Sequence, residues 1–245
     1  LDGKLVDAKA TTVPLMAYTL HYGLGVFEGI RAYDGAKGPA IFRLREHMER
    51  LVRSAHLVHM ELPANVEELM KGACDVMAAN KMRSGYLRPI GYVDDGKRGL
   101  GAMNNQVHVA IAVWPWGAYL GDEGIKRGIR CQIANVARMS PRSFYPKGKI
   151  CGQYVNSIIA KRAALLSGYD EAILLDDQGY VAEASGENVF SVRASPQFTG
   201  GARLTTPAPS SPILEDITRD SVIQVAKHLG VEVKEQRFAR DALLV

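Results

Sequence analysis

The sequence predicts a mixed fold of two α/β or α+β domains, with a small-molecule site in the cleft between them. The chain has 245 residues, which lies between one and two domains of about 150 residues each. Strand-like runs alternate with amphipathic helical segments in both halves. Between the halves, the segment Pro115-Trp116-Gly117-Ala118-Tyr119-Leu120-Gly121 interrupts this alternation. We therefore expect a smaller N-terminal domain over residues 1–114, an interdomain loop over 115–126 and a larger C-terminal domain over 127–245.

The first half predicts strands and hairpins around two helices. The alternating residues 25–33, the turn AKGP and the run AIFR predict a hairpin. Apolar residues at positions 44, 48, 51, 52, 55 and 58 form one helical stripe. Asn65 with Glu68 three positions later is typical of a helix N-cap, and this second helix buries Leu69 and its apolar neighbours. Residues 85–93 and 106–113 predict strands.

The second half alternates differently. We expect a strand over 129–136, a helix over 154–167 that ends at Gly168, and strands over 171–175 and 187–193. A last helix is predicted from Thr218 to Leu229, because Gly230 is a typical helix stop, and a strand begins at Val231.

Composition excludes several classes of protein. The sequence has 30 Lys and Arg against 26 Asp and Glu, a formal charge of +4, and its basic residues are scattered among acidic ones, so we expect no nucleic-acid partner. No apolar stretch approaches the roughly 20 residues of a membrane span, so we expect no membrane partner. The three cysteines lack CxxC spacing, which favours a reducing compartment and a cytoplasmic location.

Common catalytic motifs are missing. Residues 23–29 (GLGVFEG) imitate GxGxxG, but the third glycine is one residue late and no βαβ pattern surrounds it. Gly96-Lys97 precedes Arg98, where a P-loop needs Ser or Thr, and neither HExxH nor GxSxG occurs. His56 and His59 lie three apart on one predicted helix, but such a pair is common by chance, and we expect no metal site.

A few polar residues in apolar or glycine-rich settings remain. Lys149 is either an exposed loop residue or a partly buried amine suited to Schiff-base chemistry. Glu183, between small residues, is either a turn-facing carboxylate or a buried functional one. The pair Ile217-Thr218 opens the last helix, where Thr218 could be a plain N-cap or the free amides could bind an anion.

Six blocks of sequence favour the functional interpretation of these residues over the structural one. They are residues 20–23 (LHYG) with 26–31 (VFEGIR), 42–51 (FRLREHMERL), 86–89 (YLRP), 115–121 (PWGAYLG), 183–190 (EASGENVF) and 217–220 (ITRD). In this order and spacing the chain resembles the class IV, fold-type IV aminotransferases that use pyridoxal 5′-phosphate (PLP), and most closely the branched-chain amino-acid aminotransferases. The resemblance implies a two-domain fold like that of D-amino-acid aminotransferase, with the site in the interdomain cleft.

The resemblance also implies roles for cofactor-binding residues. Lys149 would form the internal aldimine with PLP, since its offset from Tyr154 matches the family and favours it over Lys147. Glu183 would keep the pyridine nitrogen protonated, and Tyr154 would donate to the phenolic oxygen of the ring. An arginine on a predicted helix, Arg50, would clamp the phosphate, and the amides of Ile217 and Thr218 would complete its cradle.

The function that the resemblance implies is transamination. Branched-chain L-amino acids (leucine, isoleucine and valine) and 2-oxoglutarate would give branched 2-oxo acids and L-glutamate, by ping-pong chemistry through Lys149, whose freed amine acts as general base. The substrate pocket would be lined by Tyr22, Phe27, Tyr86 and Tyr119, with Arg88 available to a distal carboxylate. From the residues alone, Tyr86 and Arg88 could equally be a same-face pair that supports a strand.

Three departures from the family pattern matter. Asp216 stands where Gly or Ser is usual, and we expect its charge and Cβ to weaken cofactor binding. Cys151 replaces a usual glycine and is either reactive or, as we favour, inert packing. The family also continues for several dozen residues beyond Val245, through a turn that binds the substrate α-carboxylate. We therefore expect a C-terminally truncated chain with an incomplete C-terminal PLP domain.

Alternatives within the same fold are a D-amino-acid aminotransferase and an aminodeoxychorismate lyase, and a further alternative is a catalytically inactive fragment that binds PLP. The blocks LHYG, YLRP and PWGAYLG together favour the branched-chain group. By resemblance we also expect a homodimer or a higher homo-oligomer.

Overall fold

The computed structural model describes residues 1–117 and 121–244. The chain divides into two compact units. The first comprises Leu1–Gly121 with the short segment Gly148–Gly152, and the second comprises Asp122–Lys147 with Gln153–Val245. The segment that carries Lys149 therefore belongs to the first unit, although the chain on both sides of it belongs to the second. The predicted domain boundaries at 114 and 127 stay a prediction.

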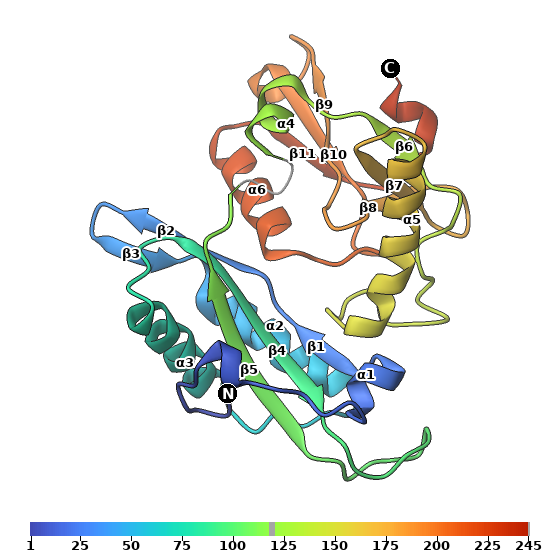
Figure 1. Ribbon diagram of the computed structural model, residues 1–245. Coiled ribbons are helices and arrows are strands. Elements are labelled where there is room, and N and C mark those ends of the chain that lie inside the picture. Colours follow the sequence, from blue (N-terminus) through green and yellow to red (C-terminus); the bar gives the residue numbers. More distant parts are fainter. Residues whose placement is uncertain (118–120, 245) are drawn as a thin grey trace. The chain divides into compact units, whose positions relative to one another are not determined.

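The first unit is built on one antiparallel sheet (Figure 1). Its elements are α1 (Tyr18–Tyr22), β1 (Gly25–Phe27), β2 (Ile30–Gly35), β3 (Gly38–Ile41), α2 (Leu44–Leu57), α3 (Val66–Ala79), β4 (Gly85–Val93) and β5 (Val107–Trp114). The long strand β4 pairs with β5 along its length, while β1 and β2 pair with successive parts of β4, and β2 forms a hairpin with β3.

The register of this sheet places Glu28 and Gly29 between β1 and β2. Phe27 lies opposite Ile90, and Ile30 lies opposite Leu87, so the two residues between them form a short interruption of the strand. At this point the Glu28 side chain is completely buried. The interruption therefore places a carboxylate inside the unit, where α2 packs against β1.

The helices of the first unit follow from capping and from apolar periodicity. Asn65 and Glu68 form a reciprocal capping box at the start of α3, which confirms the predicted N-cap. The stripe on α2 buries Met48, Leu51 and Ala55. These side chains lie in the core of the unit, which also buries Ile30 of β2.

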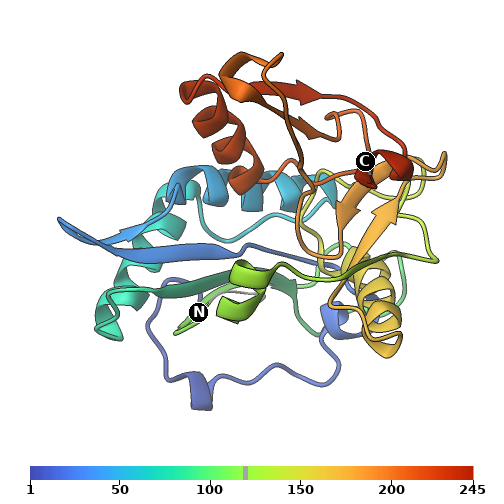
Figure 2. The same cartoon turned by 90° about the horizontal axis from the view of Figure 1, so that it is seen from above.

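The second unit contains two small sheets. Its elements are α4 (Gly121–Arg127), β6 (Cys131–Ile133), α5 (Tyr154–Leu166), β7 (Glu171–Leu175), β8 (Val181–Ala184), β9 (Ser191–Ala194), β10 (Ala202–Thr206), α6 (Ile217–His228) and β11 (Glu232–Glu235). One sheet has the order β6-β7-β8 and the other has the order β11-β10-β9. Helix α5 packs against β7, and α6 packs against β11 (Figure 2).

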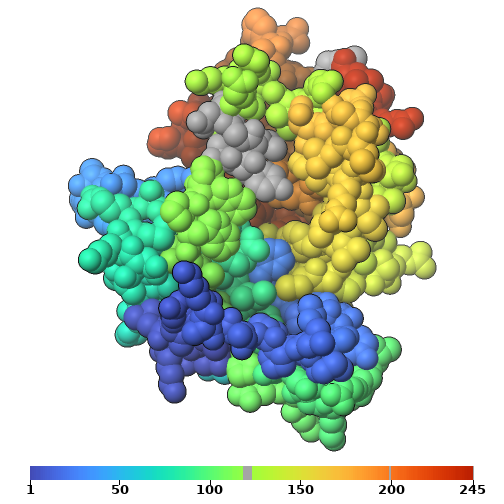
Figure 3. Space-filling model, viewed as in Figure 1, coloured from blue at the N-terminus to red at the C-terminus, as the bar shows by residue number. Residues whose placement is uncertain are grey.

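Helix α5 has two different faces. Ala160 and Ala164, one turn apart, are buried against Ala172 and Leu174 of β7. The other side leaves Val155, Ile158, Ile159, Leu165 and Leu166 exposed. In the space-filling view of Figure 3, the yellow part of the chain, which includes α5, lies on the visible surface. An exposed apolar face of this kind is typical of a surface that another protein covers.

The structure differs from the sequence prediction at several places. The strand expected over 187–193 begins only at Ser191, as β9, because the chain turns sharply after β8, where the Ala184 N–H donates to the Glu187 carbonyl. The strands β8 and β10 were not predicted. The expected loop over 115–126 contains the start of α4, since Gly121–Arg127 is helical. The short α1 was not predicted. Among the described residues, no helix is long and apolar enough to cross a bilayer.

A glycine at the end of α1 fixes the position of the Lys149 segment. Gly23 has a φ of 71°, and a Cβ there would lie 2.9 Å from the Gly152 Cα. Gly3 has a similar φ of 76°, but no atom lies within 4 Å of the place that a Cβ would take, so it tests the backbone strain alone. We expect Gly3→Ala to lower the free energy of unfolding by about 1 kcal/mol and Gly23→Ala to lower it further. Urea unfolding measures both, and equal losses would contradict the close approach.

Candidate functional site

Lys149 is fixed by backbone contacts within the first unit. Its N–H donates to Ser54 Oγ of α2 at 2.9 Å, and its carbonyl accepts from the Phe27 N–H at 3.1 Å. The next residue, Ile150, forms an antiparallel bridge with Val26, and the Gly152 N–H donates to the Gly23 carbonyl at 3.0 Å. Lys149 Nζ lies 5.1 Å from the centre of the Phe27 ring. The lysine is therefore a partly buried residue on a well-anchored segment and not an exposed loop residue.

Arg50 lies in a buried group of charges beside this segment. Its Nε and Nη2 donate to the two oxygens of Glu28 at 2.6 and 2.8 Å, and His47 Nδ1 lies 2.7 Å from Glu28 Oε2. Burial alone raises the pKa of Glu28, but the hydrogen bonds from Arg50 and His47, with the positive charges of Arg50 and Lys149, hold that pKa below its ordinary value. Glu28 is thus ionised, and it fixes the plane of the Arg50 guanidinium.

Two predicted substrate residues of the first unit, Phe27 and Tyr86, lie around the guanidinium of a third, Arg88. Arg88 lies 4.8 Å from the ring centre of Phe27 and 5.5 Å from that of Tyr86, and its Nη2 donates to the Tyr86 hydroxyl at 3.3 Å. Trp114 and Trp116 pack against Tyr86, with ring centres 5.2 and 4.4 Å away. Sequence analysis did not select these tryptophans, although PWGAYLG contains one of them.

Tyr22, another predicted pocket residue, lies apart from this group. Tyr22 is on α1, where its ring centre is 4.6 Å from that of Tyr18 and its side chain is half exposed. Tyr119 lies outside the described residues. Gly29 lies under the Tyr86 hydroxyl, because a Cβ at this position would be only 1.9 Å from that oxygen. The glycine of VFEGIR therefore makes room for a tyrosine of YLRP.

In the second unit, Glu183 is a buried carboxylate in β8 that accepts hydrogen bonds at both of its oxygens. Arg138 Nε donates to Oε1 at 2.6 Å, while the Leu214 N–H and Asn188 Nδ2 donate to Oε2 at 2.9 and 3.2 Å. These hydrogen bonds and the burial of the side chain exclude the alternative that Glu183 is a carboxylate that faces a turn. Sequence analysis missed Arg138, which has no local pattern, whereas Asn188 stands in the EASGENVF block and could have been chosen there.

The start of α6 follows directly from this network. Leu214 bonds to Glu183, and two residues later Asp216 takes the N-cap position with φ −75° and ψ 148°. Ile217 is buried and Thr218 is exposed at the first turn of the helix. Because the φ of Asp216 is ordinary, the backbone here does not need glycine, and the difference from the family pattern lies in charge and in the Cβ.

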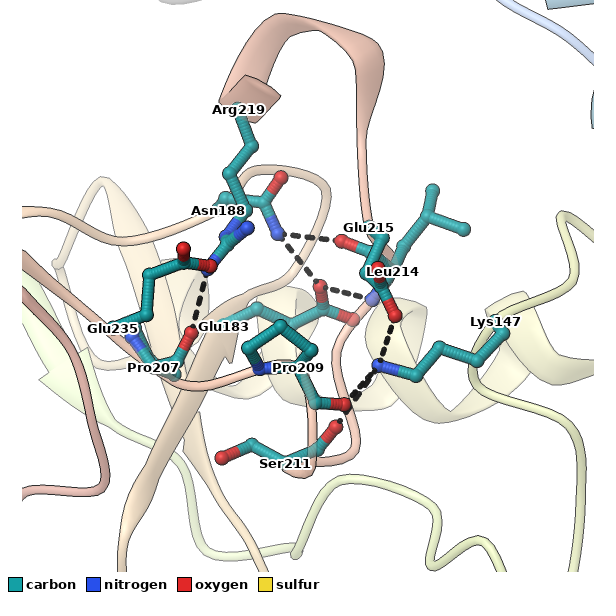
Figure 4. A network of polar contacts seen from close by, with 10 residues as sticks. All are labelled: Lys147, Glu183, Asn188, Pro207, Pro209, Ser211, Leu214, Glu215, Arg219 and Glu235. Atoms are coloured by element: carbon teal, nitrogen blue, oxygen red, sulfur yellow. Dashed lines mark hydrogen bonds and ion pairs between the residues drawn. The ribbon is translucent and has the colours of Figure 1, made fainter. Parts of the chain in front are cut away.

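Tyr154, Lys147 and Cys151 have three different surroundings. Tyr154 is the first residue of α5. Lys147, the alternative lysine, forms an ion pair with Glu215 at 2.9 Å and also donates to the Pro209 carbonyl, so it holds the loop before α6 (Figure 4). Burial raises the pKa of the Cys151 thiol to about 11, which keeps it protonated at neutral pH and favours inert packing over reactivity.

Each unit, taken by itself, carries residues of kinds that a cofactor with a cationic ring and a phosphate requires. A buried carboxylate that already accepts from an arginine, an amide and a backbone N–H is stably ionised, as a protonated ring nitrogen requires. A helix start and a buried arginine are the usual partners of phosphate. Lys149 supplies an amine, so the chemistry available is covalent binding of an aldehyde and proton transfer.

Two further carboxyls of the second unit, Glu171 and Glu187, face each other. Glu171 of β7 bonds to Lys161 Nζ at 2.5 Å and to its own following amide, and it also faces Ser185 and Glu187. Burial and the negative charge of Glu171 raise the pKa of Glu187 to about 7. The two carboxyls therefore share a proton at and below neutral pH and titrate as a pair.

Comparisons with known proteins agree with this chemistry. The family described as amino-transferase class IV matches residues 25–244. A branched-chain-amino-acid aminotransferase of Pseudomonas aeruginosa is 37% identical over 244 residues, which is 100% of this chain and 77% of that protein. The protein of the same name from Escherichia coli K12 is 40% identical over 243 residues, 99% of this chain and 76% of that protein.

Solved structures show the same relationship. The crystal structure of the Escherichia coli branched-chain amino acid aminotransferase has a TM-score of 0.93 at 39% identity, and the match covers 99% of this chain and 78% of that one. The branched-chain amino acid aminotransferase of Thermobaculum terrenum, solved in its PLP form, has a TM-score of 0.88 at 31% identity, over 100% of this chain and 78% of that one. These matches confirm the resemblance and the mixed α/β, fold-type IV class predicted from the sequence.

The raised pKa of Glu187 predicts a pH dependence of stability. Between about pH 4.3, the ordinary glutamate pKa, and about 7, the folded chain holds a proton that the unfolded chain has lost. The contribution of Glu187 to the free energy of unfolding therefore falls as the pH rises through this window. We expect Glu187→Gln to remove this fall, so that its stability relative to the parent chain increases up to about pH 7 and is constant above it.

Urea unfolding between pH 5 and 8 measures this effect, with Glu61→Gln at an exposed glutamate as the control. Parallel pH profiles for the parent chain and Glu187→Gln would contradict the shared proton.

Proposed function

The chain belongs to the class IV aminotransferases, whose cofactor is pyridoxal 5′-phosphate, and we propose that it transfers the amino group of branched-chain L-amino acids to 2-oxoglutarate. The products are the branched 2-oxo acids and L-glutamate. The observation that carries this proposal is the match along nearly the whole chain to proteins named branched-chain-amino-acid aminotransferase. The anchored Lys149 and the buried Glu183 supply the groups that transamination needs.

Each residue of the candidate site has a defined role toward the cofactor. When bound, PLP supplies an aldehyde carbon and a ring that accepts electrons. Lys149 Nζ would hold the cofactor at its aldehyde carbon, and the same amine would move a proton from the substrate Cα, a step worth about 10²–10⁴-fold when the base is well positioned. Glu183 would hold the proton on the ring nitrogen. Arg50 and the first amides of α6 would hold the phosphate, and Tyr154 would donate to the phenolic oxygen.

The substrate side joins apolar contact with one positive charge. Phe27 and Tyr86 offer ring faces to a branched side chain, and with them we propose Tyr22 and Tyr119 as pocket residues. Arg88 lies among aromatic rings and is available to the distal carboxylate of 2-oxoglutarate or L-glutamate. Because one methylene changes apolar binding by only about 1–3 kcal/mol, we expect leucine, isoleucine and valine all to be substrates.

We also propose a homodimer or higher homo-oligomer. The exposed apolar face of α5 supports such an assembly. A cytoplasmic location stays a prediction that the three free cysteines support.

Lys149 gives the direct test of the proposal. Borohydride reduction of the chain loaded with PLP should fix the cofactor on Lys149, and mass spectrometry of the digested chain should find it there. Lys149→Ala should abolish this label and lower the transamination rate by several orders of magnitude, because it removes both the amine nucleophile and the base. Lys147→Ala is the matched control and should keep the label, because Lys147 holds a neighbouring loop.

Substrate class is tested with the same protein. L-leucine, D-alanine and aminodeoxychorismate are each supplied separately, with 2-oxoglutarate as acceptor for the two amino acids. We expect turnover of L-leucine. A chain that converts only D-alanine or only aminodeoxychorismate would have another substrate, and a colourless chain that never takes up PLP would refute the proposal as a whole.

Asp216 gives a prediction with a defined sign. Its carboxylate lies at the start of α6 and repels a phosphate there. We expect Asp216→Gly to increase PLP affinity by about two- to fivefold, the effect of one exposed charge at a helix end. Asp216→Asn keeps the Cβ and removes the charge, so it separates the two causes. Equilibrium titration with PLP measures the affinity of both variants. An unchanged dissociation constant in Asp216→Gly would show that Asp216 has no effect on cofactor binding.

A further inference from the structure

We infer that Asn188 is a positioning residue that couples the ring-nitrogen end of the cofactor site to its phosphate end. The inference rests on the proposed function, since it takes Glu183 as the partner of the ring nitrogen and the first turn of α6 as a phosphate site. All residues that carry it lie in the second unit.

Asn188 donates two hydrogen bonds from one nitrogen. Nδ2 lies 3.2 Å from Glu183 Oε2 and 2.9 Å from the Leu214 carbonyl. The Leu214 N–H in turn donates to the same Glu183 oxygen at 2.9 Å. Figure 4 shows these three bonds as a closed triangle between the asparagine, the carboxylate and the loop that precedes α6. One side chain thus joins β8 to the residue three positions before Ile217.

The carboxylate cannot turn independently of this loop. Its other oxygen, Oε1, is held by Arg138 Nε at 2.6 Å, and both side chains are buried. With one oxygen fixed by Arg138, the second has a defined place, and that place determines where the Leu214 backbone can lie. A substitution that moves the carboxylate of Glu183 must therefore also move the Leu214 backbone in the loop before α6.

The rest of the loop is fastened independently of Glu183. Lys147 binds the Ser211 carbonyl at 3.4 Å and Glu215 at 2.9 Å, and it also donates to the Pro209 carbonyl (Figure 4). Arg219 donates to the Pro207 carbonyl at 2.9 Å and to Glu235 at 2.8 Å. Among the contacts drawn in Figure 4, those of Asn188 and Leu214 are the ones that reach the Glu183 carboxylate.

The coupling and simple electrostatics predict opposite effects of Glu183→Gln on the binding of phosphate. Glu183→Gln removes a negative charge, which should strengthen the binding of phosphate because it relieves a Coulomb repulsion. It also places an amide where a carboxylate accepts from Arg138 on one side and from Asn188 and Leu214 on the other, so one set of donors loses its acceptor. If the coupling exists, Glu183→Gln weakens the binding of phosphate.

The experiment uses the full chain and three ligands: PLP, pyridoxal, which lacks the phosphate, and inorganic phosphate, which lacks the ring. Asn188→Ala removes both donors without adding a charge. We expect it to weaken pyridoxal and inorganic phosphate alike, each by about tenfold, the usual effect of leaving one buried acceptor unsatisfied. Asn80→Ala is the matched control, because Asn80 Nδ2 also donates to a carbonyl, that of Val76 at 2.8 Å, in the first unit.

The outcomes separate this inference from the proposed function. The inference is wrong if Asn188→Ala weakens only one of the two partial ligands, or if Glu183→Gln leaves phosphate binding unchanged or stronger. If Asn188→Ala does not fold, Glu183→Gln still tests the inference, because the coupling predicts weaker phosphate binding and charge alone predicts stronger phosphate binding. If the parent chain takes up PLP on Lys149 while the coupling is missing, the proposed function stands without it. If the parent chain binds none of the three ligands, both fail.

Discussion

Two buried carboxylates, Glu28 and Glu183, each need a cation, and this requirement organises both units of the chain. Each is paired with an arginine at 2.6 Å, Arg50 for Glu28 and Arg138 for Glu183. Removing one partner of such a pair costs about 3–5 kcal/mol, because the charge that remains is buried without compensation. The elements that carry these four residues are therefore held in place by electrostatics as well as by apolar packing.

The elements around each pair follow from this requirement. In the first unit, the strand is interrupted after Phe27 so that Glu28 turns inward to α2. In the second, the chain turns after β8 so that Asn188 reaches Glu183, and the loop before α6 brings the Leu214 N–H to the same oxygen. The residues that would touch the cofactor are thus supported by residues that would not touch it, and the supporting residues determine the precision of the site.

Much of this could be predicted from the sequence. Helix α3 was found from its capping box and α2 from its apolar stripe, because both signals are local. Strand β8 was not predicted and β9 was predicted to begin at residue 187, before its true start at Ser191, since a run of small residues supports both a strand and a turn. The family and fold class followed from six ordered blocks. The roles given to individual residues stay proposals that the contacts of Lys149 and Glu183 support.

By itself the sequence determined the family, the fold class, and the candidate residues Lys149, Glu183 and Arg50, because motif spacing and periodicity are written in the order of residues. Only the tertiary structure decided that Glu183 is buried and accepts hydrogen bonds from Arg138, Asn188 and Leu214. It alone assigned Arg138 to Glu183 and Glu28 to Arg50, pairs that are 45 and 22 residues apart in the chain. The physical reason is that a buried charge pairs with an opposite charge that is close in space, and a local sequence pattern contains no information about that distance.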